Sequence, residues 1–342
     1  MFSMSPQHGS GMFAAPQSAM STTPVLDMSR LSVHAGPNAL VEDVSLSVRS
    51  GETLCLVGES GCGKSLTCMS MLGLLDENLA VGGSIKLFGT ETVGAPEHVL
   101  NDLRGSAVTM IFQNPMAALN PVKRVGVQIA EAIVAHTALR GAAVDRRVAE
   151  LLDQVGIPHV ERHKRYYPHQ LSGGMCQRVM IAMALACKPK LLIADEPTTA
   201  LDVTIQAQIL DLMRQLQAEL DLAIVLVTHD LGVVAEIADH VAVMYAGRVV
   251  EAAPVDALFD DPLHPYTRAL MASRIGFRRR PGTKLQAIPG TVPAPSARPA
   301  GCSFAPRCAL ASDVCRTRPV LARYGNRSVA CPSFGVQEDL SA

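Results

Sequence analysis

One short segment combines glycine, lysine and a hydroxyl group at a spacing that suits phosphate chemistry. Residues 58–65 read Gly-Glu-Ser-Gly-Cys-Gly-Lys-Ser, between an apolar run at 54–57 and a helical pattern over 66–75. Glycines let successive backbone N–H groups surround a phosphate, while Lys64 neutralises its charge and Ser65 can ligate Mg²⁺. This loop therefore predicts nucleotide binding. The expected contacts are Gly58, Glu59, Ser60, Gly61, Cys62, Gly63, Lys64, Ser65 and Leu66.

Two carboxylates and an imidazole follow two further apolar runs. Asp195 and Glu196 come directly after residues 191–194, and His229 follows residues 223–228. Open α/β sheets bind ligands beyond the carboxyl ends of their strands, so these side chains should meet at one edge. We expect Asp195 to support Mg²⁺, directly or through water, and Glu196 to act as the general base. His229 would contact the γ-phosphate and hold Glu196 and water in line.

A mainly parallel sheet is needed to hold these groups. The apolar runs at 44–48, 53–57, 108–112, 191–194, 223–228 and 241–245 predict its strands. Several are continuous rather than alternating, as expected for strands buried on both faces. Between 120 and 186 helical patterns such as 127–136 and 147–155 take over, which predicts a helical insertion into an α/β core.

Length and composition limit the class of protein. The chain has 342 residues, and 48% of them are hydrophobic, which is ample for a buried core. Its net charge of -1 gives no global electric field that would favour binding to nucleic acid or anionic lipid. No apolar run approaches the ~18 residues of a membrane-spanning helix. The N-terminus has no Lys or Arg before Arg30 and no apolar core, so a secretory signal is not expected. These features indicate a cytoplasmic protein.

Composition also suggests three parts. Residues 1–24 are poor in charge and rich in small polar residues, so we expect a flexible segment. Residues 25–275 would form the nucleotide-binding domain, with its helical subdomain at about 116–186. Residues 276–342 begin with a basic cluster and several prolines, which predicts a C-terminal extension. Arg274 and Arg278–Arg280 are interpreted as a solvated charge run rather than a lipid or permease contact.

The nine cysteines fall into two groups. Five are scattered through the first two thirds without a bridging pattern and predict reduced thiols. The other four are separated by five, six and fifteen residues, unlike the close pairs that favour structural zinc. Four thiolates suffice for an iron-sulfur cluster, while zinc and unliganded thiols remain alternatives. These four are Cys302, Cys308, Cys315 and Cys331.

A further segment carries a family resemblance. The run Leu-Ser-Gly-Gly-Met at 171–175, followed by Gln177 and Arg178, closely resembles the signature motif of ATP-binding-cassette (ABC) proteins. Ser172, Gly173 and Gly174 open a helix, so their hydroxyl and amides would meet the γ-phosphate held by a partner subunit. The resemblance implies a P-loop NTPase fold, with a RecA-like core, a helical subdomain and a C-terminal cysteine-containing extension.

Other ABC motifs appear in the expected order. Gln113 matches the family's glutamine loop, which senses Mg²⁺ and touches the membrane subunit. Asp202 lies in the segment that matches the loop crossing the dimer interface, and His229 matches the switch histidine. One position departs from the pattern, since Ala35 stands where the family has an aromatic residue that stacks on adenine. We expect weaker base discrimination there, with His34 or a residue from elsewhere as substitute.

Segments 167–175, 194–204 and 264–267, and the tail from Gly301, look like the dipeptide and oligopeptide importer branch. That resemblance implies a subunit that binds ATP and Mg²⁺ and hydrolyses ATP to energise a binding-protein-dependent importer. Its implied partners are two transmembrane permeases, a second homologous ATPase subunit and, indirectly, an extracytoplasmic binding protein, without nucleic acid. It also implies a peripheral location at the cytoplasmic face of the inner membrane and a [4Fe-4S] cluster on the four late cysteines. The alternatives are a soluble ABC ATPase acting on nucleic acid, or an importer of nickel or another small solute.

Overall fold

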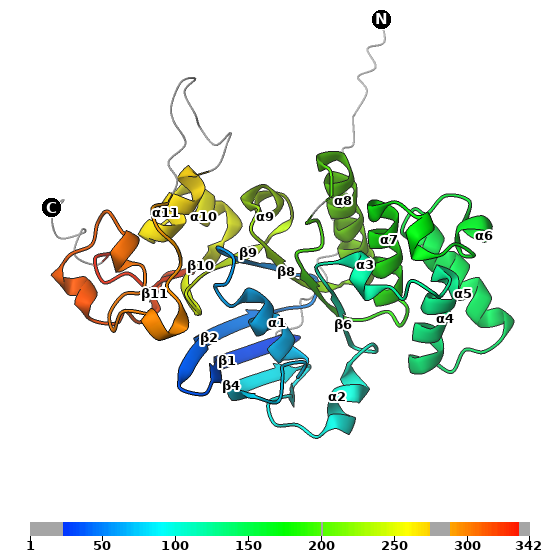
Figure 1. The fold of residues 1–342 in the computed structure, drawn as a ribbon, viewed down its shortest axis with the longest axis horizontal. Coiled ribbons are helices and arrows are strands. Elements are labelled where there is room, and N and C mark those ends of the chain that lie inside the picture. The colour runs from blue at the N-terminus through cyan, green and yellow to red at the C-terminus, as the bar shows by residue number, and fades with distance from the viewer. Residues whose placement is uncertain (1–22, 200, 274–287, 335–342) are drawn as a thin grey trace, which may run out of the picture.

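The computed structural model describes residues 23–199, 201–273 and 288–334. Two sheets and a group of helices make up the described chain. Figure 1 shows the helices α4 to α7 gathered at one end of the molecule, and the C-terminal region at the other end, beside β10. The predicted flexible segment lies outside the described residues except for its last two, and Arg274 and Arg278–Arg280 lie outside them entirely.

The larger sheet carries the predicted motifs. It has eight strands in the order β11-β12-β10-β9-β3-β8-β7-β6, and its central part from β9 to β6 is parallel. The strands β10, β12 and β11 extend it in antiparallel fashion. The bounds are β3 Thr53–Val57, β6 Val108–Ile111, β7 Leu191–Asp195, β8 Ala223–Thr228, β9 His240–Tyr245, β10 Arg248–Pro254, β11 Ala322–Tyr324 and β12 Arg327–Val329.

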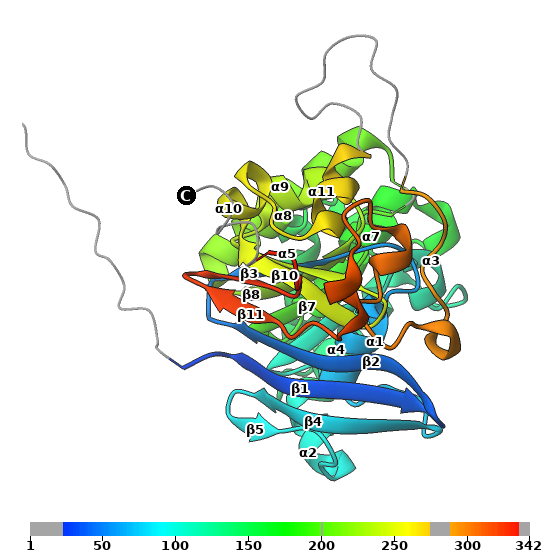
Figure 2. The ribbon, with the colours of Figure 1, turned by 90° about the vertical axis from the view of Figure 1, so that its left-hand side faces the viewer.

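The smaller sheet is antiparallel and lies against the larger one, as Figure 2 shows for β1 and β2 below β10 and β11. Its order is β2-β1-β4-β5, with β1 paired to both β2 and β4. The bounds are β1 Leu26–Ala35, β2 Asn38–Val48, β4 Leu79–Leu87 and β5 Thr90–Glu91. Of this sheet, only the end of β2 lies in an apolar run that predicted a strand, at 44–48.

Helices occupy the connections between strands. The α-helices are α1 Lys64–Met71, α2 Glu97–Leu103, α3 Pro115–Ala118, α4 Val125–His136, α5 Ala142–Gln154, α6 Val160–His163, α7 Gly173–Ala184, α8 Val203–Leu220, α9 Leu231–Ile237, α10 Val255–Asp260 and α11 Pro265–Ala272. Short 3-10 helices are η1 Pro168–Gln170, η2 Pro295–Ala297, η3 Ala305–Arg307 and η4 Asp313–Arg316. Every residue between β6 and β7 is described, and none of them is in a strand.

The core consists of two apolar layers, one on each face of the larger sheet. In β3, Leu54 and Leu56 pack toward the smaller sheet, while Cys55 and Val57 pack toward the opposite layer with α7, α8 and α9. All five residues of β3 and of β7 are buried. The prediction that strands with continuous apolar runs are buried on both faces is thus confirmed for β3 and β7. Within the described ranges, no helix has the length and apolar character needed to cross a membrane.

Candidate functional site

The loop between β3 and α1 wraps around its own lysine. Lys64 is only 5% exposed, and its Nζ donates to the carbonyls of Gly58 at 2.8 Å and Glu59 at 3.1 Å. Gly63, which precedes α1, has φ 106°, a left-handed conformation that favours glycine. A Cβ on Gly58 would lie 2.8 Å from the Cys62 sulfur, so a side chain there would not fit. The loop thus holds an ammonium group ready to exchange carbonyl contacts for a phosphate.

A pocket of about 240 Å³ opens above this loop. It brings together loop residues, Gln113 and Glu196, as the sequence predicts, and two C-terminal residues that it did not predict. Gly58, Glu59 and Cys62 are absent from its described lining, since Cys62 is fully buried and Glu59 points elsewhere. The lining residues are Leu40, Ser60, Gly61, Gly63, Lys64, Ser65, Leu66, Gln113, Glu196, Pro295 and Arg298.

Asp195 ends β7 behind this pocket. The residue is only 6% exposed, and Oδ1 is buried without a hydrogen-bond partner among the described residues. Burial and the neighbouring Glu196 raise the pKa of Asp195, while a hydrogen bond from Ser65 and the charge of Lys64 oppose the shift. An unpaired buried oxygen is costly, and a hard cation such as Mg²⁺ takes oxygen ligands of this kind. The residues therefore fit the predicted magnesium site.

Glu196 is held by groups from three separate segments. Its Oε2 accepts hydrogen bonds from Gln113 Nε2 at 3.0 Å and Thr199 Oγ1 at 2.8 Å, and its Oε1 lies 3.3 Å from His229 Nδ1. Burial alone would raise the pKa of Glu196, but Thr199 and His229 outweigh it and hold the pKa below its usual value. The carboxylate is therefore ionised and fixed in direction, as a general base requires.

Thr199 was missed by the sequence reasoning. It lies three residues after Glu196 in the turn that leaves β7, and its hydroxyl contributes the shorter of the two hydrogen bonds to Oε2. Glu196 itself has φ 49°, a left-handed conformation unusual for a residue with a Cβ. That backbone turn directs the carboxylate back toward Thr199. A threonine shortly after a strand-end carboxylate is too common a pattern to signal this contact.

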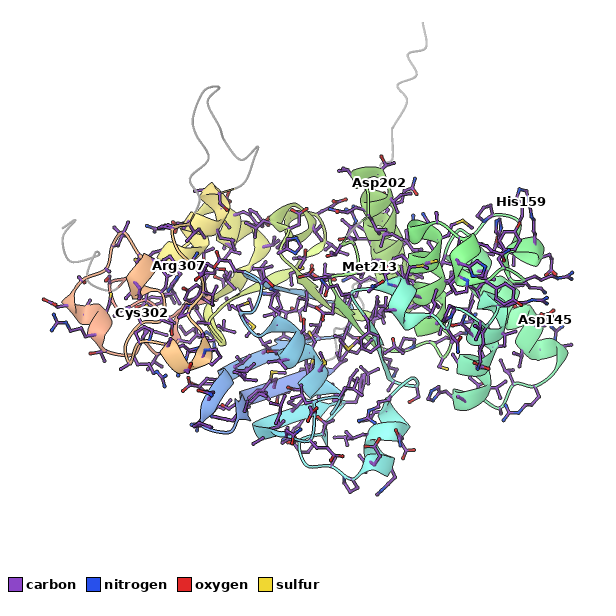
Figure 3. All side chains as sticks on the ribbon, viewed as in Figure 1. Asp145, His159, Asp202, Met213, Cys302 and Arg307 are labelled. Carbon is purple, nitrogen blue, oxygen red and sulfur yellow. The ribbon has the colours of Figure 1, made fainter. Side chains whose placement is uncertain are left out.

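The signature segment lies apart from the pocket within this chain. Ser172 caps α7, and its Oγ accepts from the N–H of Met175 at 3.3 Å. A Cβ on Gly174 would lie 2.6 Å from Ile205 at the start of α8, so the glycine lets the two helix starts pack closely. Asp202 caps α8 and accepts from the N–H of Ile205 at 2.9 Å (Figure 3). Ser172, Gly173, Gly174 and Asp202 are not among the described residues that line the pocket.

A C-terminal arginine forms an ion pair with the phosphate-binding loop. Arg307 donates from Nη1 and Nη2 to the two carboxylate oxygens of Glu59 at 2.5 Å and 3.0 Å. The backbone N–H of Glu59 also donates to the Tyr266 hydroxyl at 2.9 Å. Arg307 lies 248 positions after Glu59, so no local pattern could have indicated the pair. These contacts anchor the loop from outside the pocket.

Arg307→Ala is expected to lower the free energy of unfolding by about 2 kcal/mol, because it leaves a partly buried carboxylate without its partner. The side chains of Arg307 and Glu59 are 6% and 27% exposed, so solvent screens this pair weakly. Urea unfolding measures the loss. Arg318→Ala is the matched control, since Arg318 is 47% exposed and its pair with Glu42 should contribute less than ~1 kcal/mol. Equal losses in both variants would contradict a special role for Arg307.

The four late cysteines gather around one small cavity of about 10 Å³ in the C-terminal region. All four are free thiols, and burial raises the pKa of Cys302, Cys308 and Cys331. Figure 3 shows Cys302 in this region, near Arg307. Nevertheless, no group of three or more His, Cys, Asp or Glu side chains in the described chain is placed to hold a metal ion. The observed geometry therefore gives the predicted iron-sulfur site no support beyond thiol chemistry and proximity.

Family models match two parts of the chain. A model described as ABC transporter covers residues 41–199, and a model described as oligopeptide/dipeptide transporter, C-terminal region, covers residues 250–315. The first match spans the loop, Gln113, the signature segment and Glu196. The second covers most of β10, and Tyr266 and Arg307.

Similar proteins agree with these matches. The oligopeptide transport ATP-binding protein AppD of Bacillus subtilis is 50% identical over 86% of this chain and 91% of its own length. A Brucella abortus protein named as a peptide import ATP-binding protein is 47% identical over 92% of this chain and 96% of its own. Among solved structures, the ATP-binding cassette MJ0796, a dimer bound to ADP and phosphate, is 25% identical, with a TM-score of 0.61 over 67% of this chain and 98% of that one. CbiO1 of Clostridium perfringens is 27% identical, with a TM-score of 0.61 over 70% of this chain and 91% of that one. Together with the pocket geometry, these likenesses show that the chain belongs to the ABC transporter family, as an ATP-hydrolysing subunit of the oligopeptide/dipeptide transporter branch.

Proposed function

We propose that this chain binds and hydrolyses ATP to drive the import of dipeptides or oligopeptides through a membrane permease. The observation that carries the catalytic part is the fixed, ionised Glu196 facing the same pocket as Lys64. The names of the relatives from Bacillus subtilis and Brucella abortus support the peptide cargo. Uptake of labelled peptide by vesicles carrying the whole transporter tests it. Uptake of nickel without peptide uptake would contradict the cargo.

Each pocket residue has a proposed task. Lys64 gives up its carbonyl contacts to bind the β- and γ-phosphates, and the amides of the glycine loop complete that cradle. Ser65, Gln113 and Asp195 would hold Mg²⁺, which supplies charge neutralisation on the phosphates when bound. Glu196 accepts a proton from the attacking water, and His229 keeps that carboxylate in line. Thr199 fixes the second carboxylate oxygen.

A second ATPase subunit is proposed to complete each site. Ser172 and Gly173 are exposed in this chain, while Gly174 is buried, and none of the three lines the phosphate pocket among the described residues. The hydroxyl and free N–H groups of this helix start suit the γ-phosphate of a partner subunit, and Asp202 lies beside it at the start of α8. The MJ0796 dimer supports such a pairing. ATP would then hold the two subunits together, and hydrolysis would release them.

An apolar groove is proposed to receive the permease. It measures about 290 Å³ and is lined by Leu74, Phe112, Leu119 and Met180 among others, beside Gln113. Leu74 and Phe112 are 40% and 44% exposed, and exposed apolar patches of this kind mark interaction sites. The groove would place the chain peripherally at the cytoplasmic face of the inner membrane. Its position next to Gln113 would couple docking to the nucleotide pocket.

Leu74→Asp is expected to reduce recovery of the chain with its permease by at least about tenfold, because a carboxylate would be buried in the apolar contact. The measurement is co-purification from membranes that contain both permease subunits. Val320→Asp is the control, since Val320 is 79% exposed and lies outside the groove. A normal recovery of the Leu74 variant would rule out this groove as the docking surface.

An iron-sulfur cluster on Cys302, Cys308, Cys315 and Cys331 is also proposed. Its support is four free thiols around one cavity, which suits the ligand chemistry of such clusters. When bound, the cluster would crosslink the C-terminal region. Iron and sulfide analysis after anaerobic purification tests it. A protein that contains neither element after reconstitution with iron and sulfide would leave these cysteines as unliganded thiols.

A further inference from the structure

The residues near position 35, where the family has the aromatic residue that stacks on adenine, do not form the wall of the nucleotide pocket. Neither His34 nor Ala35 is among the described residues that line it. Instead, the pocket wall contains Pro295 and Arg298, from the part of the chain that follows α11. The C-terminal region therefore supplies two side chains to a pocket whose other residues all come from positions 40–196.

Arg298 is fixed at this wall by the first residues of β2. Its Nη1 donates to the carbonyl of Ala39 at 2.6 Å, and its Nη2 donates to the carbonyl of Leu40 at 3.1 Å. Nε is buried and has no partner among the described residues. Both carbonyl contacts use the ends of the guanidinium, and the side chain is among those that line the pocket. The strand that follows Ala35 thus holds a different flat group.

A glycine turn makes room for this arrangement. Gly247, between β9 and β10, has φ 83°, and a Cβ there would lie 2.8 Å from Arg298 Nη1. The N–H of Gly247 donates to the carbonyl of Cys62 at 2.9 Å, and its carbonyl accepts from the N–H of Glu42 at 2.8 Å. One turn therefore ties Arg298 to the phosphate-binding loop. A larger residue at 247 would displace the arginine.

We propose that Arg298, supported by Pro295, forms the adenine-binding surface of this protein. The face of the guanidinium stacks on the purine ring and takes the role that an aromatic residue at position 35 would have. Guanidinium planes stack on nucleic-acid bases as aromatic rings do, and a rigidly held arginine loses little conformational freedom on binding. The inference rests on ATP being the ligand of the pocket. It adds that base recognition depends on the C-terminal region.

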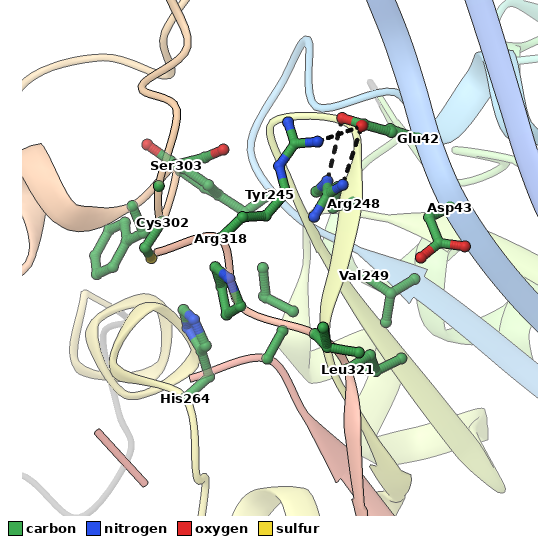
Figure 4. A pocket seen from close by; sticks show the side chains of 16 residues that line it. Glu42, Asp43, Tyr245, Arg248, Val249, His264, Cys302, Ser303, Arg318 and Leu321 are labelled. Carbon is green, nitrogen blue, oxygen red and sulfur yellow. Dashed lines mark hydrogen bonds and ion pairs between the residues drawn. The ribbon is translucent and has the colours of Figure 1, made fainter. Parts of the chain in front are cut away.

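The test compares two ligands that share their phosphates. Arg298→Ala is expected to weaken MgATP binding about tenfold, the size of one lost base stack, while binding of Mg-tripolyphosphate stays within about twofold. Isothermal titration of the full chain measures both. Arg318→Ala is the control, because this C-terminal arginine pairs with Glu42 beside Arg248 (Figure 4) and is not among the described residues that line the nucleotide pocket. It should leave both affinities unchanged.

Arg298→Lys covers the case in which the alanine variant does not fold. Lysine keeps the charge and one carbonyl contact but has no planar face, so the same selective loss of ATP binding is expected. Equal weakening of both ligands would overturn the assignment, since Arg298 would then act on the phosphates or on the loop. Unchanged ATP affinity in both variants would overturn it too. A wild-type chain that binds neither ligand would overturn the nucleotide site itself as well.

Discussion

Glu196→Gln is expected to lower the steady-state ATPase rate about 10³-fold, with ATP affinity within about twofold of wild type. Glutamine keeps the length of the side chain and one oxygen for Thr199 or Gln113, but it cannot take a proton from water. The binding contacts of Lys64 and the glycine loop are untouched. A phosphate-release assay and equilibrium titration of ATP, run on the same preparation, measure the two quantities.

Glu52→Gln is the matched control for this experiment. Glu52 also pairs with a histidine, since its Oε1 lies 3.1 Å from His240 Nε2, and its pKa is likewise lowered against the effect of burial. It lies at the opposite end of β3 from the phosphate-binding loop. Its variant should keep the wild-type rate. An equal loss in both variants would indicate that disturbing any carboxylate-histidine pair harms the fold, and full activity of the Glu196 variant would remove Glu196 from catalysis.

The parallel part of the fold could be predicted because its strands are buried on both faces. The continuous apolar runs at β3, β7 and β8 are typical of strands whose side chains are buried on both faces, as they are here. Glu196 and His229 follow from the same reasoning, because parallel strands end at one edge. In the antiparallel strands β1 and β4, exposed residues interrupt the buried and half-buried ones. These strands therefore contain no continuous apolar run that would have predicted them.

Contacts made by the C-terminal region were beyond prediction for a different reason. Arg298 reaches Ala39 across 259 positions, and Arg307 reaches Glu59 across 248. No periodicity links such distant residues, and an arginine in a proline-rich segment resembles any solvated charge. The loop motif predicted Glu59 as a nucleotide contact, and the structure shows that its carboxylate pairs with Arg307. The absence of an aromatic residue at position 35 was visible in the sequence, but its replacement was not.

Ser172→Asp is expected to abolish ATP-driven dimerisation and to lower the ATPase rate at least about 10²-fold, while each subunit still binds ATP. Aspartate caps a helix as well as serine does, so the bond to the Met175 N–H and the stability of α7 should persist. Its negative charge, however, would face the γ-phosphate of the partner subunit. Size-exclusion chromatography with ATP, using Glu196→Gln as the background that prevents turnover, measures the dimer.

Ser172→Asn separates charge from shape in this test. Asparagine caps equally well and is nearly the size of aspartate, so it carries the same steric change without the charge. If the helix start meets a phosphate, the asparagine variant should dimerise far better than the aspartate variant, and added salt should narrow the difference because screening weakens repulsion. If both variants fail alike, the contact is steric rather than anionic. If both dimerise normally, Ser172 lies outside the interface, and the site in each chain would then be complete without its partner.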